Sequence, residues 1–157
     1  MTNSEFIHIY MPYSRKVYAF AYNLLRRRED AEDVMQEVYM ELWKLCQSGK
    51  PPEKPLAFML TTTRNKCLNI ISQRRPMENE TALMNLPDGA SDYANKERLE
   101  LVLREIDRLP SDQREIIHLR AIQGLEFDEI SAIVGKTEGA IRVILSRARK
   151  MLKEQLQ

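Results

Sequence analysis

Acidic side chains are concentrated between residues 29 and 41 of this 157-residue sequence, a segment with six carboxylates and no basic residue. Asp33, Glu37 and Glu41 recur every four residues and would share one face of a helix. Such a face could hold Mg²⁺, as in all-helical nucleotide pyrophosphohydrolases, if a neighbouring helix supplied further carboxylates. The next expected helix, residues 56–75, contains no Asp or Glu, and the sequence has no glycine-rich phosphate loop. We therefore expect no metal site and no enzyme, but an acidic face suited to docking on a basic protein surface.

The other reactive residue types do not form a recognisable catalytic set. Cys46 and Cys67 are too few for a disulfide scaffold or a thiolate zinc site, and we expect both to be reduced and buried. His8 and His118 are far apart in sequence and have no Cys or carboxylate at ligand spacing. No Ser/His/Asp or Cys/His arrangement supports covalent catalysis. The sequence therefore predicts no cofactor and no small-molecule substrate.

Residues 56–75 combine amide and hydroxyl side chains with basic ones. Thr61, Asn65 and Asn69 recur every four residues, and four cations accompany them: Arg64, Lys66, Arg74 and Arg75. Asn is a mediocre helix former, so this stripe needs a reason other than helix stability. Amides and hydroxyls can read unpaired bases while cations hold the strand, and the proline-rich loop at 47–55 could accept an extruded base. A solvated polar face is the alternative, and the stripe alone does not decide between them.

The C-terminal segment is strongly basic. Between residues 136 and 153 it holds six basic residues and one acidic residue. Arg suits bidentate contact with guanine in the major groove, and both Arg and Lys neutralise phosphates. Because early residues of a recognition helix reach base edges, we assign base reading to Arg142, Val143 and Arg147. The same polar face includes Ser146, and phosphate contacts are expected for Lys136, Arg149, Lys150 and Lys153. A solvated basic face on a terminal helix is the alternative.

Proline and glycine divide the chain into helix-length windows, and apolar residues within them recur with helical spacing. No segment alternates convincingly with the two-residue period of a strand. Asp30 can cap the helix that carries the acidic face. The core stripe of that helix is expected at Ala31, Met35, Val38, Leu42 and Leu45. The chain is therefore expected to be all-α.

The C-terminal windows have the pattern of a helix-turn-helix. Ser111 can cap one helix, Gly135 can end a short helix at 126–134, and Thr137 can cap a final helix running to about residue 156. The short helix is expected to bury Phe127, Ile130 and Val134. The final helix is expected to bury Ile141, Leu145, Ala148 and Leu152. A short helix, a turn and a longer cationic helix are the parts of a DNA-binding motif.

The formal net charge of +1 conceals an uneven distribution. Residues 76–97 carry five acidic residues and one basic residue with little apolar periodicity, which predicts an acidic linker between two helical modules. The longest apolar run, residues 17–22, is far shorter than the about 20 residues of a membrane span. The first residues also lack the basic start of a signal peptide, so we expect a cytoplasmic protein without membrane insertion.

Together these features resemble the extracytoplasmic-function (ECF) group of bacterial RNA polymerase sigma factors over nearly the whole chain. Residues 30–39 (DAEDVMQEVY) resemble the region 2 segment that docks on the polymerase clamp helices. Residues 60–69 (LTTTRNKCLN), followed by 74–75, are similar to the stretch that melts and reads the minus-ten element. Residues 109–115, 129–135, 139–142 and 145–149 resemble region 4, which reads the minus-thirty-five element.

The resemblance implies an all-α fold of two small helical domains, a region 2 helical bundle at 1–76 and a region 4 helix-turn-helix at 98–157. A flexible acidic linker at 77–97 would join them. The implied partners are core RNA polymerase, through its clamp helices and flap, and promoter DNA. An anti-sigma factor, often membrane-bound, is a further implied partner, and it would hold this nucleoid-associated cytoplasmic protein at the membrane.

The resemblance also assigns residues to surfaces. Polymerase docking falls on Asp30, Asp33, Gln36 and Glu37. Minus-ten recognition falls on Thr61, Arg64, Asn65, Asn69, Arg74 and Arg75. Minus-thirty-five recognition falls on Lys136, Arg142, Val143, Ser146, Arg147, Arg149 and Lys150.

The sequence departs from the family pattern at several positions. Phe58 stands where the family commonly has Trp, and Val143 and Ile144 replace a more usual polar pair. The family's promoter sequences therefore do not carry over to this chain. A stand-alone dimeric helix-turn-helix regulator is the alternative function, but it leaves the acidic helix and the Asn stripe without a role.

Overall fold

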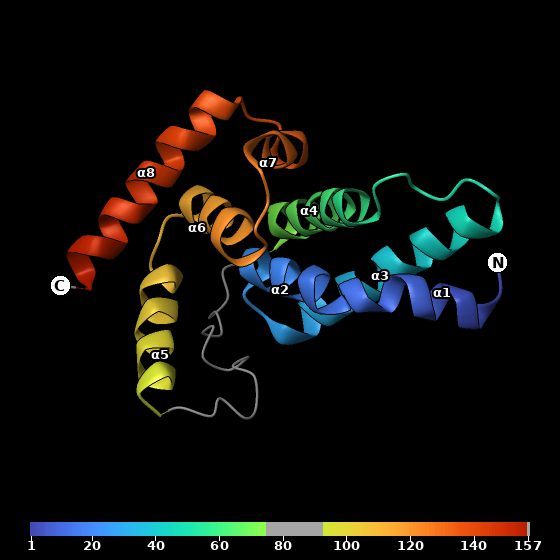
Figure 1. Cartoon of the computed structure of the whole chain (residues 1–157), viewed down its shortest axis with the longest axis horizontal. Helices are drawn as coiled ribbons and strands as arrows, with labels where there is room; N and C mark the ends of the chain where they lie inside the picture. The colour runs from blue at the N-terminus through green and yellow to red at the C-terminus, as the bar shows by residue number, and fades with distance from the viewer. Residues whose placement is uncertain (75–92, 157) are drawn as a thin grey trace. The chain divides into compact units, whose positions relative to one another are not determined.

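The computed structural model describes residues 1–74 and 93–156, and all regular structure within these ranges is helical (Figure 1). The all-α expectation is therefore confirmed. The α-helices are α1 (Asn3–Tyr10), α2 (Ser14–Leu25), α3 (Arg28–Gln47), α4 (Pro55–Gln73), α5 (Tyr93–Asp107), α6 (Ser111–Ile117), α7 (Phe127–Val134) and α8 (Glu138–Gln155). A 3₁₀ turn, Met11–Tyr13, follows α1, and a π-helical turn, His118–Ile122, follows α6. Helices α1–α4 form one compact unit and α5–α8 a second, except that Ala132–Gly135 group with the first.

Helix α1 was not expected from the sequence, although it has a clear start signal. The Thr2 hydroxyl accepts from the Glu5 amide and the Glu5 carboxylate accepts from the Thr2 amide, both at 3.2 Å, which is a complete capping box. The Phe6 ring lies 5.0 Å from the Trp43 ring in edge-to-face geometry. The Tyr39 hydroxyl donates to the Tyr10 carbonyl at 2.7 Å. These contacts hold α1 against α3.

The break between α2 and α3 depends on an arginine rather than on a glycine or proline. Arg26 has a φ of 63°, in the left-handed region, and its amide donates to the Tyr22 carbonyl at 2.8 Å. This is the hydrogen bond of a left-handed helix end, which glycine normally supplies. Arg27 then occupies the N-cap of α3 without a side-chain cap bond. The expected capping role of Asp30 is therefore wrong, since Asp30 lies inside the first turn of α3.

Helices α2, α3 and α4 pack against one another around a shared apolar core. The α3 stripe is Ala31, Val34, Val38 and Leu42, all fully buried, followed by Cys46. The sequence-based stripe was shifted, because it placed Met35 and Leu45 in the core, whereas both are only half-buried. The opposing residues include Val17, Phe20 and Leu25 from α2 and Met59, Leu60 and Cys67 from α4. The prediction that both cysteines are buried is confirmed.

Arg74 ties the end of α4 to the other two core helices. Its Nη1 donates to the Leu25 carbonyl at the end of α2 at 2.7 Å, and its Nη2 donates to the Asp30 Oδ2 on α3 at 2.8 Å. The Arg74 side chain is 15% exposed and that of Asp30 is 36% exposed. One guanidinium therefore satisfies a helix-end carbonyl and a carboxylate through its fork of donors.

In the second unit, the turns and caps follow the expected helix-turn-helix pattern with two corrections. Pro110, not Ser111, is the N-cap of α6, and α7 begins at Phe127 rather than at residue 126. Gly135 has a φ of 71°, and the Thr137 hydroxyl accepts from the Ala140 amide at 3.1 Å to cap α8. The core includes Ile116, Leu119, Ile130, Ile141, Leu145 and Ala148. Leu152 is only half-buried, and Ile144 joins the core instead.

His118 is buried in this second core, at the junction of α6 and the π-helical turn. Its Nε2 lies 3.0 Å from the Gln123 Nε2, and burial lowers the pKa of His118 from 6.5 to about 4. The imidazole is therefore neutral at pH 7 and packs as part of the interior.

We predict that this histidine makes stability depend on pH. The unfolded chain takes up a proton near pH 6.5 and the folded chain only near pH 4. The free energy of unfolding is therefore highest above pH 6.5, and it decreases by about 3 kcal/mol as the pH falls to 4. His118→Leu should flatten this part of the pH profile, measured by urea unfolding at several pH values. The control is His8→Gln, which changes an exposed histidine on α1 and should retain the dependence; an unchanged profile in His118→Leu would contradict the prediction.

We also predict that Arg74→Met lowers the free energy of unfolding of the first unit by about 1–3 kcal/mol. The reason is that the substitution removes the guanidinium that donates to the Leu25 carbonyl and to the Asp30 carboxylate. Urea denaturation measures the loss. Lys44→Met, at an exposed position on α3, should change stability by less than about 0.5 kcal/mol. Equal stability of the two variants would show that Arg74 is not a structural tie.

Candidate functional site

The outward face of α3 carries the predicted docking residues. Asp33, Gln36 and Glu37 are exposed, because the apolar stripe of Val34 and Val38 faces the core. Asp30, assigned to the same surface, pairs with Arg74 instead of standing free. The structure therefore presents three of the four docking residues to solvent and holds the fourth in an internal contact.

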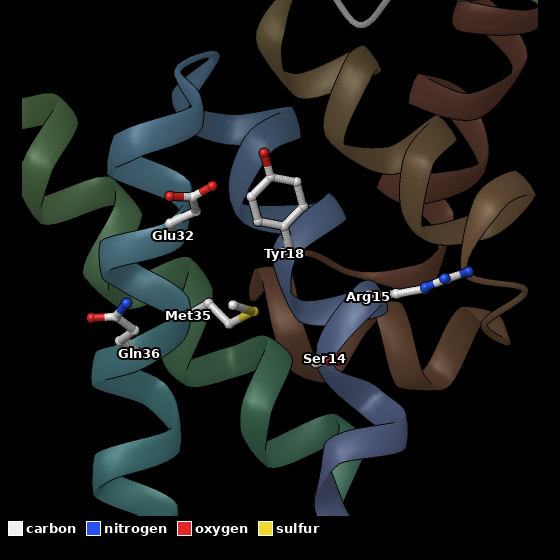
Figure 2. A pocket seen from close by; sticks show the side chains of 6 residues that line it. All are labelled: Ser14, Arg15, Tyr18, Glu32, Met35 and Gln36. Carbon is white, nitrogen blue, oxygen red and sulfur yellow. The ribbon is translucent and has the colours of Figure 1, made fainter. Parts of the chain in front are cut away.

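An open hollow lies between α2 and α3 next to this acidic face. It is lined by Ser14, Arg15, Tyr18, Glu32, Met35 and Gln36. Figure 2 shows the Met35 side chain reaching from α3 toward α2, while Arg15 extends outward from α2. The sequence pattern assigned Gln36 to docking but did not identify Ser14, Arg15 and Tyr18, because nothing in the sequence shows which face of α2 lies beside α3. A flexible thioether beside polar groups can accommodate a protruding side chain of a partner protein.

Lys66 links α4 to the acidic face. Its Nζ lies 2.7 Å from Glu41 Oε1 and 3.6 Å from Glu37 Oε2. The hydrogen bond with Glu41 is the largest cause of the raised pKa of Lys66, so the ammonium stays charged across the neutral range. Glu37 and Glu41, considered above as possible magnesium ligands, thus share one cation. Within residues 1–74 and 93–156, no group of three or more His, Cys, Asp or Glu side chains is arranged to hold a metal ion.

The predicted base-reading stripe forms one face of α4. Asn65 and Asn69 are exposed and Thr61 is half-buried. The neighbouring Thr63 points inward, where its hydroxyl donates to the Met59 carbonyl at 2.6 Å. The Asn69 amide oxygen accepts from Gln73 Nε2 at 3.5 Å, a long contact that leaves the side chain at the surface. On α4 the amides of Asn65 and Asn69 therefore face outward, whereas the hydroxyl of Thr63 faces the core.

The cations expected beside this stripe have different environments. Arg64 is half-buried, Lys66 pairs with α3, and Arg74 is held by Leu25 and Asp30. Arg75 lies outside the described residues. Sequence spacing placed Arg64, Lys66 and Arg74 on α4 or at its end, but it could not show that Lys66 and Arg74 have partners on other helices.

The predicted minus-thirty-five residues of α8 lie in two groups. Val143, Arg147 and Lys150 are exposed on the side opposite the core, and Val143 is 50% exposed. Arg142, Ser146 and Arg149 line a second hollow with Leu145 and with Phe127 of α7. Lys136 is half-buried in the turn, and its carbonyl accepts from the Ser131 hydroxyl at 2.6 Å. All seven residues of the predicted minus-thirty-five set therefore lie on α8 or in the turn before it.

Phe127 differs from its expected role as a core residue. It is half-buried, and its ring lies beside two guanidinium groups, those of Arg120 and Arg142. Each guanidinium carbon is 4.6 Å from the ring centroid, which is cation–π distance. At the start of α7 the ring is thus only half-buried and lies beside two cations.

None of the helices in the described parts of the chain combines the length and the apolar character required to cross a membrane.

Comparison with family models gives two matches in chain order. Residues 9–76 match the model "Sigma-70 region 2", and residues 99–152 match the model "Sigma-70, region 4". Together the two models cover well over half of the chain.

Curated sigma factors are similar over most of this sequence. An "ECF RNA polymerase sigma-E factor" of Escherichia coli is 27% identical over 142 residues, 82% of this chain and 74% of the relative. The "ECF RNA polymerase sigma factor SigE" of Mycolicibacterium smegmatis is 26% identical, over 90% of this chain and 57% of the relative. A "Probable RNA polymerase sigma factor RfaY" of Xanthomonas campestris is 26% identical, over 89% of this chain but 37% of the relative. The chain thus spans less than two thirds of two of these relatives.

Two solved structures have a similar fold. The sigma factor RpoE from Bartonella quintana, solved in complex with the anti-sigma factor NepR, matches with a TM-score of 0.79 and 25% identity, covering 97% of this chain and 96% of that chain. CnrH, solved in complex with the cytosolic domain of CnrY, matches with a TM-score of 0.69 and 21% identity, covering 99% and 89%, and supports the fold alone. With both region models matched in order along one helical chain, the protein belongs to the sigma-70 family, in the ECF group of RNA polymerase sigma factors.

Proposed function

We propose that this chain binds core RNA polymerase and directs it to promoters by recognising a minus-ten and a minus-thirty-five element. Residues 1–76 would supply docking and minus-ten recognition, and residues 98–157 minus-thirty-five recognition. Residues 77–97 would form the linker, whose last residues belong to the first turns of α5. The observation that carries the proposal is the order of three exposed polar faces, on α3, α4 and α8, in a chain matched by both sigma region models. A dimeric regulator would need only the last of these faces.

Polymerase docking is assigned to the outward face of α3. Asp33, Gln36 and Glu37 offer two carboxylates and an amide to a basic partner surface, the clamp helices of the polymerase. The adjoining hollow, which Tyr18 and Met35 help to line, adds an apolar surface against which a partner side chain can pack. Asp30 contributes to this surface indirectly, because its pairing with Arg74 fixes the first turn of α3.

Minus-ten recognition is assigned to α4. The exposed amides of Asn65 and Asn69, with Thr61 on the same face, can pair with the edges of unpaired bases. The loop at 47–55 would present an extruded base, and Arg64 would contact the strand. Arg74 would act mainly through the fold, since both halves of its guanidinium already have protein partners.

Minus-thirty-five recognition is assigned to α8 as the recognition helix. Arg142, Val143 and Arg147 would reach base edges, with Ser146 beside them. The backbone contacts would come from Lys136, Arg149 and Lys150. A region 4 flap contact would hold the reading helix near the upstream duplex.

The chain would have no catalytic chemistry and no cofactor of its own, since it supplies specificity to the polymerase. The similar solved structures are described as complexes with an anti-sigma factor and with the cytosolic domain of a partner protein. By analogy we propose an anti-sigma partner for this chain and a cytoplasmic location. Such a partner would compete with polymerase by covering the same polar faces.

The test of this function is run-off transcription from a library of randomised promoters, with core polymerase and the full chain. We expect transcripts only when both proteins are present, and a selected promoter with two conserved elements. In that promoter, Arg142→Ala should relax base preference at one minus-thirty-five position by about 1–3 kcal/mol. Transcription that never depends on the chain, with binding to a palindromic site in the absence of polymerase, would identify a dimeric regulator instead.

We predict that the double variant Asp33→Ala, Glu37→Ala weakens capture of core polymerase by about tenfold, because it removes the two exposed carboxylates of the docking face. Affinity for surface-immobilised core polymerase measures the effect. The matched control is Glu53→Ala with Glu154→Ala, which changes the net charge equally at exposed positions off this face. Equal affinity of the two double variants for core polymerase would contradict the assignment of docking to this face of α3.

A further inference from the structure

The start of α7 carries an aromatic ring whose environment the proposed function does not explain. Phe127 is half-buried at the first position of the helix. The guanidinium carbons of Arg120 and Arg142 are both 4.6 Å from its ring centroid. One ring therefore contacts a residue of the π-helical turn and a residue of the proposed recognition helix.

Arg120 is fixed independently of the ring. Its Nη1 donates to the Leu125 carbonyl at 2.8 Å and lies 3.6 Å from a carboxylate oxygen of Glu126. These contacts span the turn that leads into α7. Arg120 therefore serves as an anchor that helps hold the Phe127 ring at a defined place beside α8.

Arg142 is in a different situation, because it is exposed and carries the proposed base contact. An exposed arginine loses side-chain conformational freedom when it binds in one orientation. Contact with an aromatic face restricts the guanidinium before binding and so reduces this cost. Arg142 also lines a hollow with Ser146 and Arg149, which keeps the stacked guanidinium open to a ligand from outside.

We infer that Phe127 is a positioning residue for Arg142: its ring orients the guanidinium that contacts the minus-thirty-five element, although Phe127 lies outside the recognition helix. The inference rests on the proposed function of α8. It requires the ring and not merely an apolar side chain, because a leucine fills similar space without an aromatic face.

The experiment is a double-mutant cycle on DNA binding. Full-length chain is assembled with core polymerase, and affinity is measured for a fluorescent promoter selected from the randomised library. Phe127→Leu should weaken binding about two- to tenfold when Arg142 is present. In the Arg142→Ala background the same change should have no effect, because the residue through which the ring acts is absent. Phe127→Tyr, which keeps the ring, should bind as the wild type does.

Several outcomes would overturn the inference. An equal loss from Phe127→Leu in both Arg142 backgrounds would mean that the ring only stabilises the fold, and so would a loss in Phe127→Tyr as large as in Phe127→Leu. Wild-type affinity in Phe127→Leu would mean that the ring has no role in binding. If Phe127→Leu lowers the unfolding temperature, Phe127→Met replaces it in the cycle.

The proposed function can fail separately from this inference. A second promoter with its minus-thirty-five element replaced should show no difference between wild type and Phe127→Leu. If the wild-type holoenzyme binds both promoters equally, α8 does not read that element and the proposed function is wrong at that site. If the wild type distinguishes the promoters and the cycle shows no coupling, only the role of Phe127 is wrong.

Discussion

Burial of one apolar stripe per helix is the constraint on which the rest of this structure depends. The stripe of α3 from Ala31 to Leu42 is fully buried, and Ile141, Leu145 and Ala148 do the same for α8. Small helical units have little interior, so charged residues must occupy the outer faces. In this chain the outer faces are sorted by sign, with carboxylates on α3 and guanidiniums on α8. A net charge of +1 is therefore compatible with an acidic face on α3 and a basic face on α8.

The helices were largely predictable because their signals are local. The Gly135 stop and the Thr137 cap depend only on neighbouring residues, and both are found where expected. The errors arose where tertiary contacts override a local preference. Arg26 adopts a left-handed conformation that local sequence signals do not predict, and the buried stripe of α3 runs through Val34 rather than Met35. The missed α1 had a usable signal in the Thr2 and Glu5 capping box.

The sequence predicted which residues share each polar face, but not which side chains on different helices contact one another. Helical spacing is enough to place Asn65 and Asn69, or Arg142 and Arg147, on the solvent side. It cannot show that Arg74 meets Asp30, 44 positions away in sequence, or that Lys66 reaches Glu37 and Glu41. Those pairs depend on how α4 packs against α3. They matter for function because a charge already paired within the protein is less available to a partner.

For the proposed function, these ion pairs within the protein help to explain how individually weak binding surfaces can give specific binding. Exposed carboxylates such as Asp33 and Glu37 contribute modestly on their own in water, and so does each amide of α4. When one chain carries the docking face and both DNA-reading faces, the first contact raises the effective concentration of the others. Each face then needs few residues, provided that those residues are held in place. That support comes from residues that need not touch the partner: Lys66 of α4 beside the acidic face, Arg74 at the end of α4, and Phe127 beside α8.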